Sequence, residues 1–336
     1  MIETYALFGS GTTGRIIARD FNAKHIPFVF VDSDPAKQHT LMEGVNVFAP
    51  LDAKEKYPNA TWLASTIIPT FHKEITEEIE RLGVKTIPVW GFLPERTTPP
   101  PHNVALELLA MVAHDKESYD ELRDQIDLRL NPSTHSQRPP SDIRDIYFPE
   151  FIIRREDEHF VDAGAADGDT VREFLKHWSK WRYITAFEPD LRNFEKAERY
   201  VGDSIKLVNA ALSDHNGVAD FVETGDYSAH ISVNKELRIS SRTVVLPLDS
   251  WNFDPPPTYI KMDIEGSEPA ALWGARRILK EHKPVLAICA YHESSHFWEI
   301  PLLLYALQPE YRLYFRRYAQ GSFEIVWYAV PPERIK

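Results

Sequence analysis

The sequence predicts an α/β protein built from two separate units. Two glycine-rich turns, at residues 9–14 and 162–170, each follow a short apolar strand and open a helix. After each turn, strand-like and helix-like segments alternate, which is typical of a parallel sheet with crossover helices. The 336 residues provide enough chain for about two domains of roughly 150 residues.

The first unit is expected to span residues 1–93 and to hold a half-sized Rossmann-like sheet. Apolar periodicity predicts strands at 5–8, 27–31, 61–64 and 84–89, and helices at 15–24 and 71–82. Gly83 follows the second helix at the position of a C-terminal cap. A proline-rich linker containing helical residues 104–130 is expected over 94–145.

The second unit is expected to span residues 146–336. Its predicted strands are 159–161, 183–187, 206–209, 259–262 and 285–290, with a helix at 171–178. Two later segments, 311–318 and 324–330, alternate like an antiparallel hairpin at a sheet edge. We expect the charged residues of 311–318 to face water there.

Charge and composition limit the classes of partner. The chain has 50 acidic and 38 basic residues. This acidic excess argues against nucleic acid as a partner, because proteins bind nucleic acid mainly through basic side chains. The single cysteine, Cys289, excludes an internal disulfide and a zinc site built on paired cysteines. No apolar run reaches the roughly 18 residues of a membrane span, and the first residues do not resemble a signal peptide. We expect a cytoplasmic protein with no membrane partner. Whether the chain forms a homodimer is left open by the sequence.

The second turn and the strand after it indicate a nucleotide-like ligand. Glycines at 164 and 168 allow close approach of the backbone, and Glu188 ends the next strand, where a carboxylate can accept hydrogen bonds from ribose. Acidic side chains beside the turn repel a pyrophosphate but suit a ligand with a ribose, an amino-acid moiety and a cationic centre. S-adenosylmethionine (SAM) has all three. These features alone also allow NAD binding or a plain turn with a surface acid.

Further motifs extend this pattern along the chain. They are YFPEFI (147–152), EHFVDAGAADGDT (158–170), AFEPD (186–190), NAALSD (209–214), YIKMDIEGSEPAALWGA (259–275) and, within 287–318, AICAYHESSHFWEIPLLLYAL and YRLYFRRY. Together they resemble the FkbM-type methyltransferases over about residues 147–330. The resemblance implies a class I SAM-dependent methyltransferase fold, SAM as cofactor, and O-methylation of a hydroxyl on a sugar, glycan or natural product.

The resemblance also implies roles for individual residues. Asp162, Gly164, Ala165 and Gly168 would contact the methionine end of the cofactor, Glu188 its ribose, and Asn209 and Ala210 would begin the loop that faces adenine. Asp263 ends the fourth strand, and ligands of open parallel sheets bind at such strand ends. The acceptor would be a small molecule or a carbohydrate.

Methyl transfer to an alcohol benefits from a general base. Asp263 and His292, each following a strand, are the leading catalytic candidates, with Glu265 and His230 as alternatives. His230 lies in a polar loop, 225–234, that could cover the pocket. His292 and His296 with Glu293 and Glu299 could be read as a metal cluster, but no third ligand of convincing spacing appears, so no metal is predicted.

The first unit carries a possible second nucleotide site. Gly9, Gly11 and Gly14 follow a strand, and Asp32 ends the next one, which fits the dinucleotide-binding fingerprint. The unit resembles the small Rossmann-like domain found ahead of some FkbM and sugar-modifying enzymes. The sequence does not decide whether this unit binds a nucleotide or serves only as a scaffold. Two other functions also stay open: an NAD(P)-linked oxidoreductase that uses this turn, and a non-catalytic nucleotide-binding module.

Overall fold

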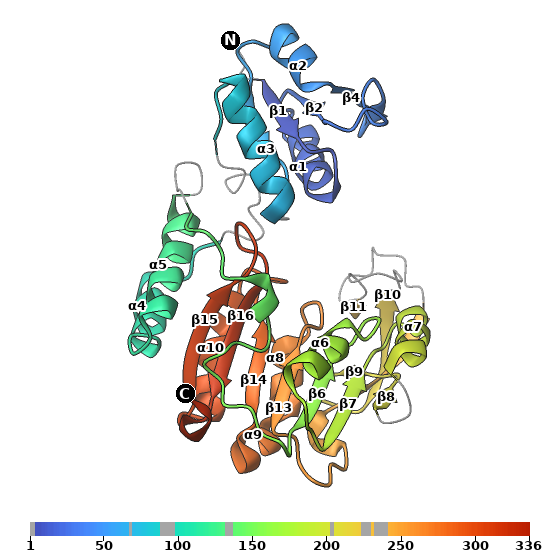
Figure 1. The fold of residues 1–336 in the computed structure, drawn as a ribbon, viewed down its shortest axis with the longest axis vertical. Coiled ribbons are helices and arrows are strands. Elements are labelled where there is room, and N and C mark those ends of the chain that lie inside the picture. The colour runs from blue at the N-terminus through green and yellow to red at the C-terminus, as the bar shows by residue number, and fades with distance from the viewer. Residues whose placement is uncertain are drawn as a thin grey trace. The chain divides into compact units, whose positions relative to one another are not determined.

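The chain forms two compact units (Figure 1). The computed structural model describes residues 4–66, 69–87, 98–131, 137–201, 205–222, 230–231 and 241–336. The first unit comprises Met1–Pro99, Arg123–Ser141 and Arg317–Phe323, and the second comprises Pro100–Leu122, Asp142–Arg316 and Glu324–Lys336. The sequence-based boundaries at 93 and 145 stay predictions.

The first unit begins with alternating strands and helices. These are β1 (Tyr5–Phe8), α1 (Thr12–Ala23), β2 (Phe28–Val31), β3 (Leu41–Met42), β4 (Val45–Phe48), α2 (Pro50–Lys56), β5 (Thr61–Ala64) and α3 (Pro69–Leu82). The sheet order is β3-β4-β2-β1-β5, and all neighbours are parallel except β3 and β4. The predicted parallel sheet with crossover helices is therefore confirmed for this unit.

The first unit differs from the sequence-based prediction at one predicted strand and at two short segments for which nothing was predicted. In its described part, the strand predicted at 84–89 makes only a single bridge, between Thr86 and Trp62, and residues 88 and 89 lie outside the described residues. The β3–β4 hairpin and α2 were not predicted, because segments this short show too little periodicity.

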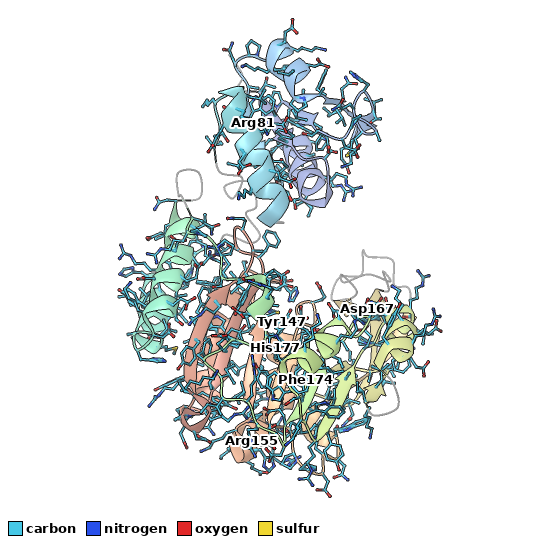
Figure 2. The ribbon with its side chains drawn as sticks, viewed as in Figure 1. Arg81, Tyr147, Arg155, Asp167, Phe174 and His177 are labelled. Carbon is cyan, nitrogen blue, oxygen red and sulfur yellow. The ribbon has the colours of Figure 1, made fainter. Side chains whose placement is uncertain are left out.

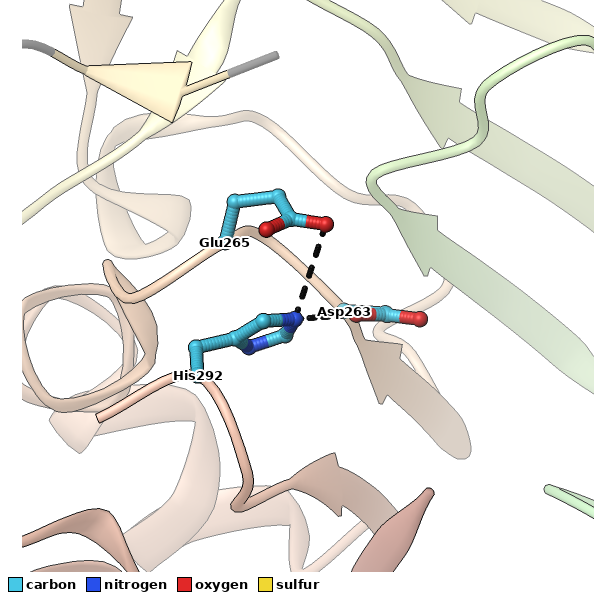
Figure 3. Close-up of side chains that lie close together, drawn as sticks. All are labelled: Asp263, Glu265 and His292. Carbon is cyan, nitrogen blue, oxygen red and sulfur yellow. Dashed lines mark ion pairs between the residues drawn. The ribbon is translucent and has the colours of Figure 1, made fainter. Parts of the chain in front are cut away.

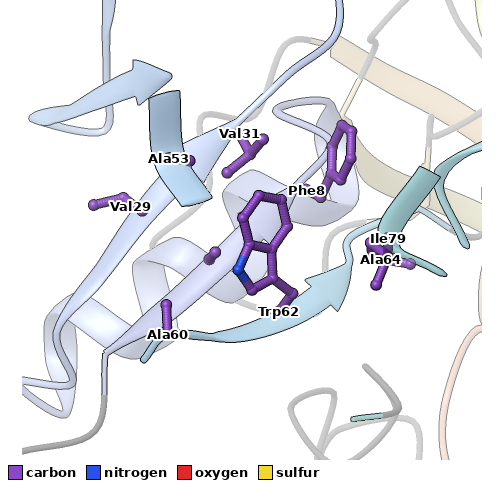
Figure 4. Packing of buried hydrophobic residues seen from close by; sticks show 9 residues of the cluster. Phe8, Val29, Val31, Ala53, Ala60, Trp62, Ala64 and Ile79 are labelled. Atoms are coloured by element: carbon purple, nitrogen blue, oxygen red, sulfur yellow. The ribbon is translucent and has the colours of Figure 1, made fainter. Parts of the chain in front are cut away.

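The apolar core of this unit packs around Trp62 (Figure 4). The Trp62 side chain is fully buried, and its ring meets Phe8 edge to face at 5.8 Å between centroids. Val29 and Val31 of β2 belong to the same cluster. Strands buried along their whole length explain why these segments read as continuous apolar runs.

Helix α1 begins three residues before its predicted start, so Gly14 lies inside the helix. A Cβ atom at residue 14 would lie 2.1 Å from the carbonyl oxygen of Gly9. Glycine at this position therefore allows the first turn of the helix to approach the end of β1.

A seven-stranded sheet forms the second unit. Its strands are β6 (His159–Ala163), β7 (Tyr183–Phe187), β8 (Lys206–Val208), β13 (Tyr259–Met262), β14 (Val285–Cys289), β15 (Arg312–Arg317) and β16 (Ile325–Val330). The order is β15-β16-β14-β13-β6-β7-β8. From β14 to β8 all neighbours are parallel, and β16 is antiparallel to β14. The carboxyl ends of β14, β13, β6 and β7 therefore lie side by side (Figure 1).

A smaller four-stranded sheet, in the order β11-β10-β12-β9, accompanies the large one. It consists of β9 (Ala211–Leu212), β10 (Gly217–Val222), β11 (His230–Ile231) and β12 (Ser241–Leu246). The sequence analysis did not predict it. Two of its strands have only two residues, and β9 pairs with β12 across about thirty intervening positions, which local periodicity does not reveal.

Helices and short 3-10 turns complete the described chain. They are α4 (His102–Met111), α5 (Lys116–Leu130), η3 (Ile143–Asp145), α6 (Asp169–His177), α7 (Leu191–Val201), η4 (Leu248–Ser250), α8 (Glu268–Gly274), α9 (Arg276–His282), α10 (His296–Leu307) and η5 (Pro332–Arg334). No helix in the described ranges is long and apolar enough to cross a bilayer.

Aromatic rings anchor α6 to the sheet. Phe174 of α6, labelled in Figure 2, stacks on Phe160 of β6 at 4.6 Å between centroids and on Trp178 at 4.4 Å. All three side chains are buried. This packing fixes the helix that follows the glycine-rich turn, and so fixes the turn itself.

The prediction that the charged residues of 311–318 face water is wrong for Arg316 and Arg317. Both side chains are buried although β15 is an edge strand. Arg316 pairs with Asp115 at 3.1 Å and donates to the hydroxyl oxygen of Ser118. Residues at the start of α5 therefore satisfy Arg316 from a part of the chain that is distant in sequence.

Candidate active site

A cavity of about 310 Å³ opens at the carboxyl ends of the parallel strands. Residues that follow β6, β7, β13 and β14 all contribute to its wall. The wall includes Tyr147, Gly164, Ala166, Asp169, Phe187, Glu188, Asn193, Ala210, Leu212, Phe221, Asp263, Ile264, Glu265, Tyr291 and Glu324. Open parallel sheets bind small molecules at this edge, so the cavity is the candidate active site.

Glu188 is a buried carboxylate on this wall, directly after β7. Its two oxygens accept backbone N–H groups, from Ala166 at 2.7 Å and from Asp190 at 2.8 Å. Burial nevertheless raises the pKa of Glu188 to about 7, because the two N–H groups only partly replace lost water. Each carboxylate oxygen keeps further acceptor capacity for a ligand in the cavity.

The glycine-rich turn after β6 is held mainly by the protein itself. A Cβ at Gly164 would lie 1.8 Å from the carbonyl oxygen of Asp263, and φ is +76°. Glycine is required there so that the ends of β6 and β13 can meet. The N–H groups of Gly164 and Ala165 donate to Phe187, and that of Gly168 donates to Ala165.

Beneath the turn, Asp162 and Lys261 form a fully buried ion pair. The Lys261 Nζ atom lies 3.1 Å from Asp162 Oδ1 and donates to the carbonyl oxygen of Gly164 at 2.7 Å. Burial lowers the pKa of Lys261, but the charges of Asp162 and Asp263 outweigh it and raise the pKa above its ordinary value. The pair ties β6 to β13 immediately below the cavity.

Asp263 is the carboxylate at the end of β13. The Tyr147 hydroxyl donates to its Oδ2 at 2.8 Å, and His292 Nε2 lies 3.1 Å from its Oδ1. Burial raises the pKa of Asp263, but the adjacent imidazole and the Lys261 charge outweigh it and hold the pKa well below the usual range. Asp263 therefore presents an ionised carboxylate to the cavity.

His292 lies behind Asp263 between carboxylates (Figure 3). Its Nδ1 atom is 2.9 Å from Glu268 Oε1, and its Nε2 atom is 3.6 Å from Glu265 Oε1. Burial lowers the pKa of His292, but the charges of Glu268 and Asp263 raise it well above its ordinary value. A protonated imidazole cannot accept a proton, so in this state His292 supports Asp263 rather than acting as a base.

Glu268, the first residue of α8, is fully buried. It accepts the N–H groups of Ile264 and Gly266, and its pKa falls to about 2 because His292 and His296 outweigh the effect of burial. Glu268 thus fixes both the loop after β13 and the two histidines.

Backbone strain also gathers at the cavity. Four wall residues other than glycine have positive φ: Tyr147 (68°), Ala166 (44°), Glu265 (53°) and Glu324 (47°). Such conformations are unfavourable for side chains of this size and concentrate at functional sites. Burial, followed by the charge of Asp263, raises the pKa of Glu324 to about 7.

Residues 162–319 match the family model described as the methyltransferase FkbM domain. The chain carries an FkbM methyltransferase domain. This finding confirms the resemblance drawn from the motifs and the prediction of a methyltransferase, whereas transfer to an oxygen atom stays a prediction. The family implies SAM as the methyl donor.

Comparison with solved structures supports the FkbM fold. The chain matches a crystal structure of methyltransferase FkbM from Methylobacillus flagellatus KT with a TM-score of 0.74 and 20% identity, over 98% of this chain and 90% of that one. The α/β class I methyltransferase fold is therefore confirmed. UDP-D-quinovosamine 4-dehydrogenase from Vibrio fischeri matches with a TM-score of 0.22 and 20% identity, over 32% of this chain and 85% of that one, which supports no conclusion here. No curated protein sequence matches the chain.

The structure of the FkbM domain separates the sequence-predicted site residues into two groups. Gly164, Glu188, Ala210 and Asp263 line the cavity, whereas Asp162, Ala165, Gly168, Asn209 and His292 lie outside its wall. Asn209 instead donates to the carbonyl oxygen of Glu188 at 2.8 Å, which fixes the strand end. The loop 225–234 lies almost wholly outside the described residues, as does the side chain of His230.

Sequence reasoning assigned no role to Tyr147, Tyr291 or Glu324, which also line the cavity. Tyr147 and Tyr291 fall within the quoted motifs YFPEFI and AICAYH, so the motifs contained a signal for them. Glu324 comes immediately before β16 and reaches the cavity because β16 pairs with β14.

The turn of the first unit is arranged differently from that of the FkbM domain. The Asp32 carboxylate accepts both the N–H and the hydroxyl of Ser10, and Lys37 Nζ lies 3.2 Å away. Burial raises the pKa of Asp32, but these contacts outweigh it and lower the pKa. The proposed contacts of Gly9, Gly11, Gly14 and Asp32 with a nucleotide stay predictions.

The residues of the cavity fit SAM. Glu188 offers a ribose acceptor, and the carboxylates of Asp169, Glu188 and Asp263 favour a cationic ligand over a pyrophosphate. Leu212 and Phe221 add apolar surface of the kind that holds an adenine ring.

Proposed function

We propose that the FkbM domain transfers the methyl group of SAM to a hydroxyl oxygen of a carbohydrate or a similarly hydroxylated small molecule. The observation that carries the proposal is a single cavity whose wall holds both Glu188, a buried carboxylate suited to ribose, and Asp263, an ionised carboxylate held by Tyr147. When bound, SAM supplies an electrophilic methyl group on a sulfonium centre.

Glu188 would accept hydrogen bonds from the ribose hydroxyls. Its two backbone donors, on Ala166 and Asp190, already fix the orientation of the carboxylate, so little rearrangement is needed on binding. A pre-oriented acceptor of this kind fixes the donor relative to the strand ends, and alignment is the main requirement of an in-line displacement.

Asp263 and Glu265 would orient the acceptor. Their side chains are 21% and 30% exposed, so each can accept a hydrogen bond from a hydroxyl in the cavity. Carboxylates on this wall repel an anionic acceptor and favour a neutral one with several hydroxyls. A sugar meets this requirement, which supports carbohydrate as the acceptor class.

Calorimetric titration with SAM tests the donor part of the proposal. The wild-type chain should bind SAM, Glu188→Ala should lose most of the affinity, and Glu195→Ala should bind as the wild type does. Glu195 is an exposed acid on α7, so its removal matches the charge change without reaching the cavity. Equal affinity of the Glu188→Ala and Glu195→Ala variants would contradict the proposed ribose contact.

A transfer assay with methyl-labelled SAM tests the acceptor part. Neutral monosaccharides, oligosaccharides and simple alcohols should be compared with amines, thiols and carboxylic acids of similar size. The proposal predicts label in an alkali-stable ether on a hydroxylated acceptor. Label on nitrogen or sulfur, or no turnover with any hydroxylated acceptor, would contradict it.

A further inference from the structure

We propose that Asp263, Glu265 and His292 form a binding site for a divalent metal ion at the wall of the cavity. Ligand atoms from the three side chains lie within 4.8 Å of one another (Figure 3). Two carboxylates and one imidazole are a donor set that binds divalent cations. This trio differs from the His292 and His296 cluster considered from the sequence.

The distances around His292 Nε2 suit coordination to a common ion. Asp263 Oδ1 is 3.1 Å from Nε2, and Glu265 Oε1 is 3.6 Å from it. Metal–ligand bonds of about 2.1 Å place neighbouring ligands about 3.0 Å apart in octahedral geometry and about 3.4 Å apart in tetrahedral geometry. A small adjustment of the partly exposed Glu265 side chain would complete either arrangement.

The His292 side chain is a second, independent observation. It is only 5% exposed, and its Nε2 atom lies within ion-pair distance of both Asp263 and Glu265 without a well-directed hydrogen bond to either. Buried ring nitrogens without a hydrogen bond are uncommon. Figure 3 shows Nε2 directed at the space between Asp263 and Glu265, which is where an ion would complete it.

Glu268 supports this orientation from the other side of the ring. Its Oε1 atom lies 2.9 Å from Nδ1, and the carboxylate is fully buried and anchored by the N–H groups of Ile264 and Gly266. Metal-binding histidines commonly have such a carboxylate at the nitrogen that does not bind the ion. A bound cation would displace the Nε2 proton of the imidazolium, because a histidine nitrogen coordinates a metal only in its unprotonated form.

The site would leave coordination positions open toward the cavity. Asp263 and Glu265 line the cavity and His292 lies behind them, so the remaining positions face the space expected to hold the acceptor. A cation there would bind an acceptor hydroxyl and lower its pKa. This role rests on the proposed methyl transfer, whereas the binding of the ion does not.

Manganese(II) is a suitable probe because it accepts both carboxylate and imidazole ligands. The full chain, freed of metal with a chelator, should be titrated with Mn²⁺ while free Mn²⁺ is followed by electron paramagnetic resonance. The wild type should bind one ion, and Glu265→Gln should raise Kd at least about tenfold. Glu293→Gln, which removes an exposed acid next to His292, should change Kd less than about twofold.

Two results would overturn the proposal. One is no binding by the wild type up to about 1 mM Mn²⁺, the weak end of the range for protein cation sites. The other is equal Kd for the Glu265→Gln and Glu293→Gln variants. Mn²⁺ binding without methyl transfer would leave the metal site standing and remove the proposed function. Transfer that is unaffected by the chelator, with no Mn²⁺ binding, would do the reverse.

Discussion

The two glycine-rich turns of this protein share a sequence pattern and differ in what their acidic partner does. After β2, the Asp32 carboxylate accepts hydrogen bonds from Ser10 and forms an ion pair with Lys37, and its pKa is lowered. After β7, Glu188 accepts two N–H groups, yet its pKa is raised to about 7, and it lines a cavity. We therefore expect a ligand at Glu188, whose carboxylate keeps acceptor capacity toward the cavity, and not at Asp32; the glycine-rich turn alone does not distinguish the two cases.

Gly164 of the second turn and Gly11 of the first should differ most in their effect on stability, whereas Gly14 of the first turn is closely packed like Gly164. Gly164→Ala places a Cβ 1.8 Å from a backbone oxygen at positive φ, whereas nothing lies within 4 Å of a Cβ at Gly11. We expect Gly164→Ala to lower the free energy of unfolding by more than about 4 kcal/mol, and Gly11→Ala by about 1 kcal/mol or less. Denaturant unfolding measures both, and similar values would contradict the close approach of the Asp263 backbone to Gly164.

The lysines that pair with Asp162 and with Asp32 should also differ, with the larger loss of stability in the FkbM domain. Lys261→Met leaves Asp162 buried without its partner, which should cost about 3–5 kcal/mol of unfolding free energy. Lys37 is 43% exposed, so Lys37→Met should cost less than about 1 kcal/mol. Thermal unfolding of the two variants at one pH compares them directly, and equal losses would contradict the assignment of Asp162 and Lys261 as a structural pair.

Donor binding should distinguish the acids themselves. Glu188→Ala should weaken SAM binding about 100-fold, since it removes hydrogen bonds to a charged acceptor, each worth roughly 1.5–3 kcal/mol. Asp32→Ala should leave the Kd for SAM within about twofold, because Asp32 is not among the residues that line the cavity. A larger effect at Asp32 than at Glu188 would transfer the donor site to the first unit.

The pH dependence of SAM binding should show the smallest effect. Glu188 must be ionised to accept hydrogen bonds from both ribose hydroxyls, and its pKa in the free protein is about 7. Affinity should therefore fall as the pH drops below 7, by about tenfold between pH 8 and pH 6. Calorimetry at three pH values measures this, and the Glu188→Gln variant should show a flat profile. An affinity that rises at low pH would contradict the role of Glu188.

Much of the fold could be predicted from sequence because the parallel strands are buried, continuous apolar runs. Segments such as 5–8 and 259–262 are confirmed to the residue. The small sheet of β9 to β12 could not be predicted, since its strands are short and pair over long separations. The burial of Arg316 depends on Asp115, about 200 positions away, which no local pattern reveals.

The candidate site shows the same division. Glu188 and Asp263 could be predicted because strand ends converge at one edge of a parallel sheet. The structure adds a reason for glycine at 164, because its missing Cβ makes room for the backbone of Asp263, and the predicted contact of Gly164 with a ligand stays a prediction. The grouping of His292 with Glu265 and Glu268 required the structure, since spacing along the chain does not show which side chains share a face.

A crystal structure of the full chain with S-adenosylhomocysteine, the demethylated product of SAM, tests the central claim most directly. The account predicts density in the cavity at the ends of β6, β7 and β13, with the ribose hydroxyls on the carboxylate of Glu188. Density at the glycine-rich turn after β1 instead, or a cavity filled only by water at saturating ligand, would contradict it.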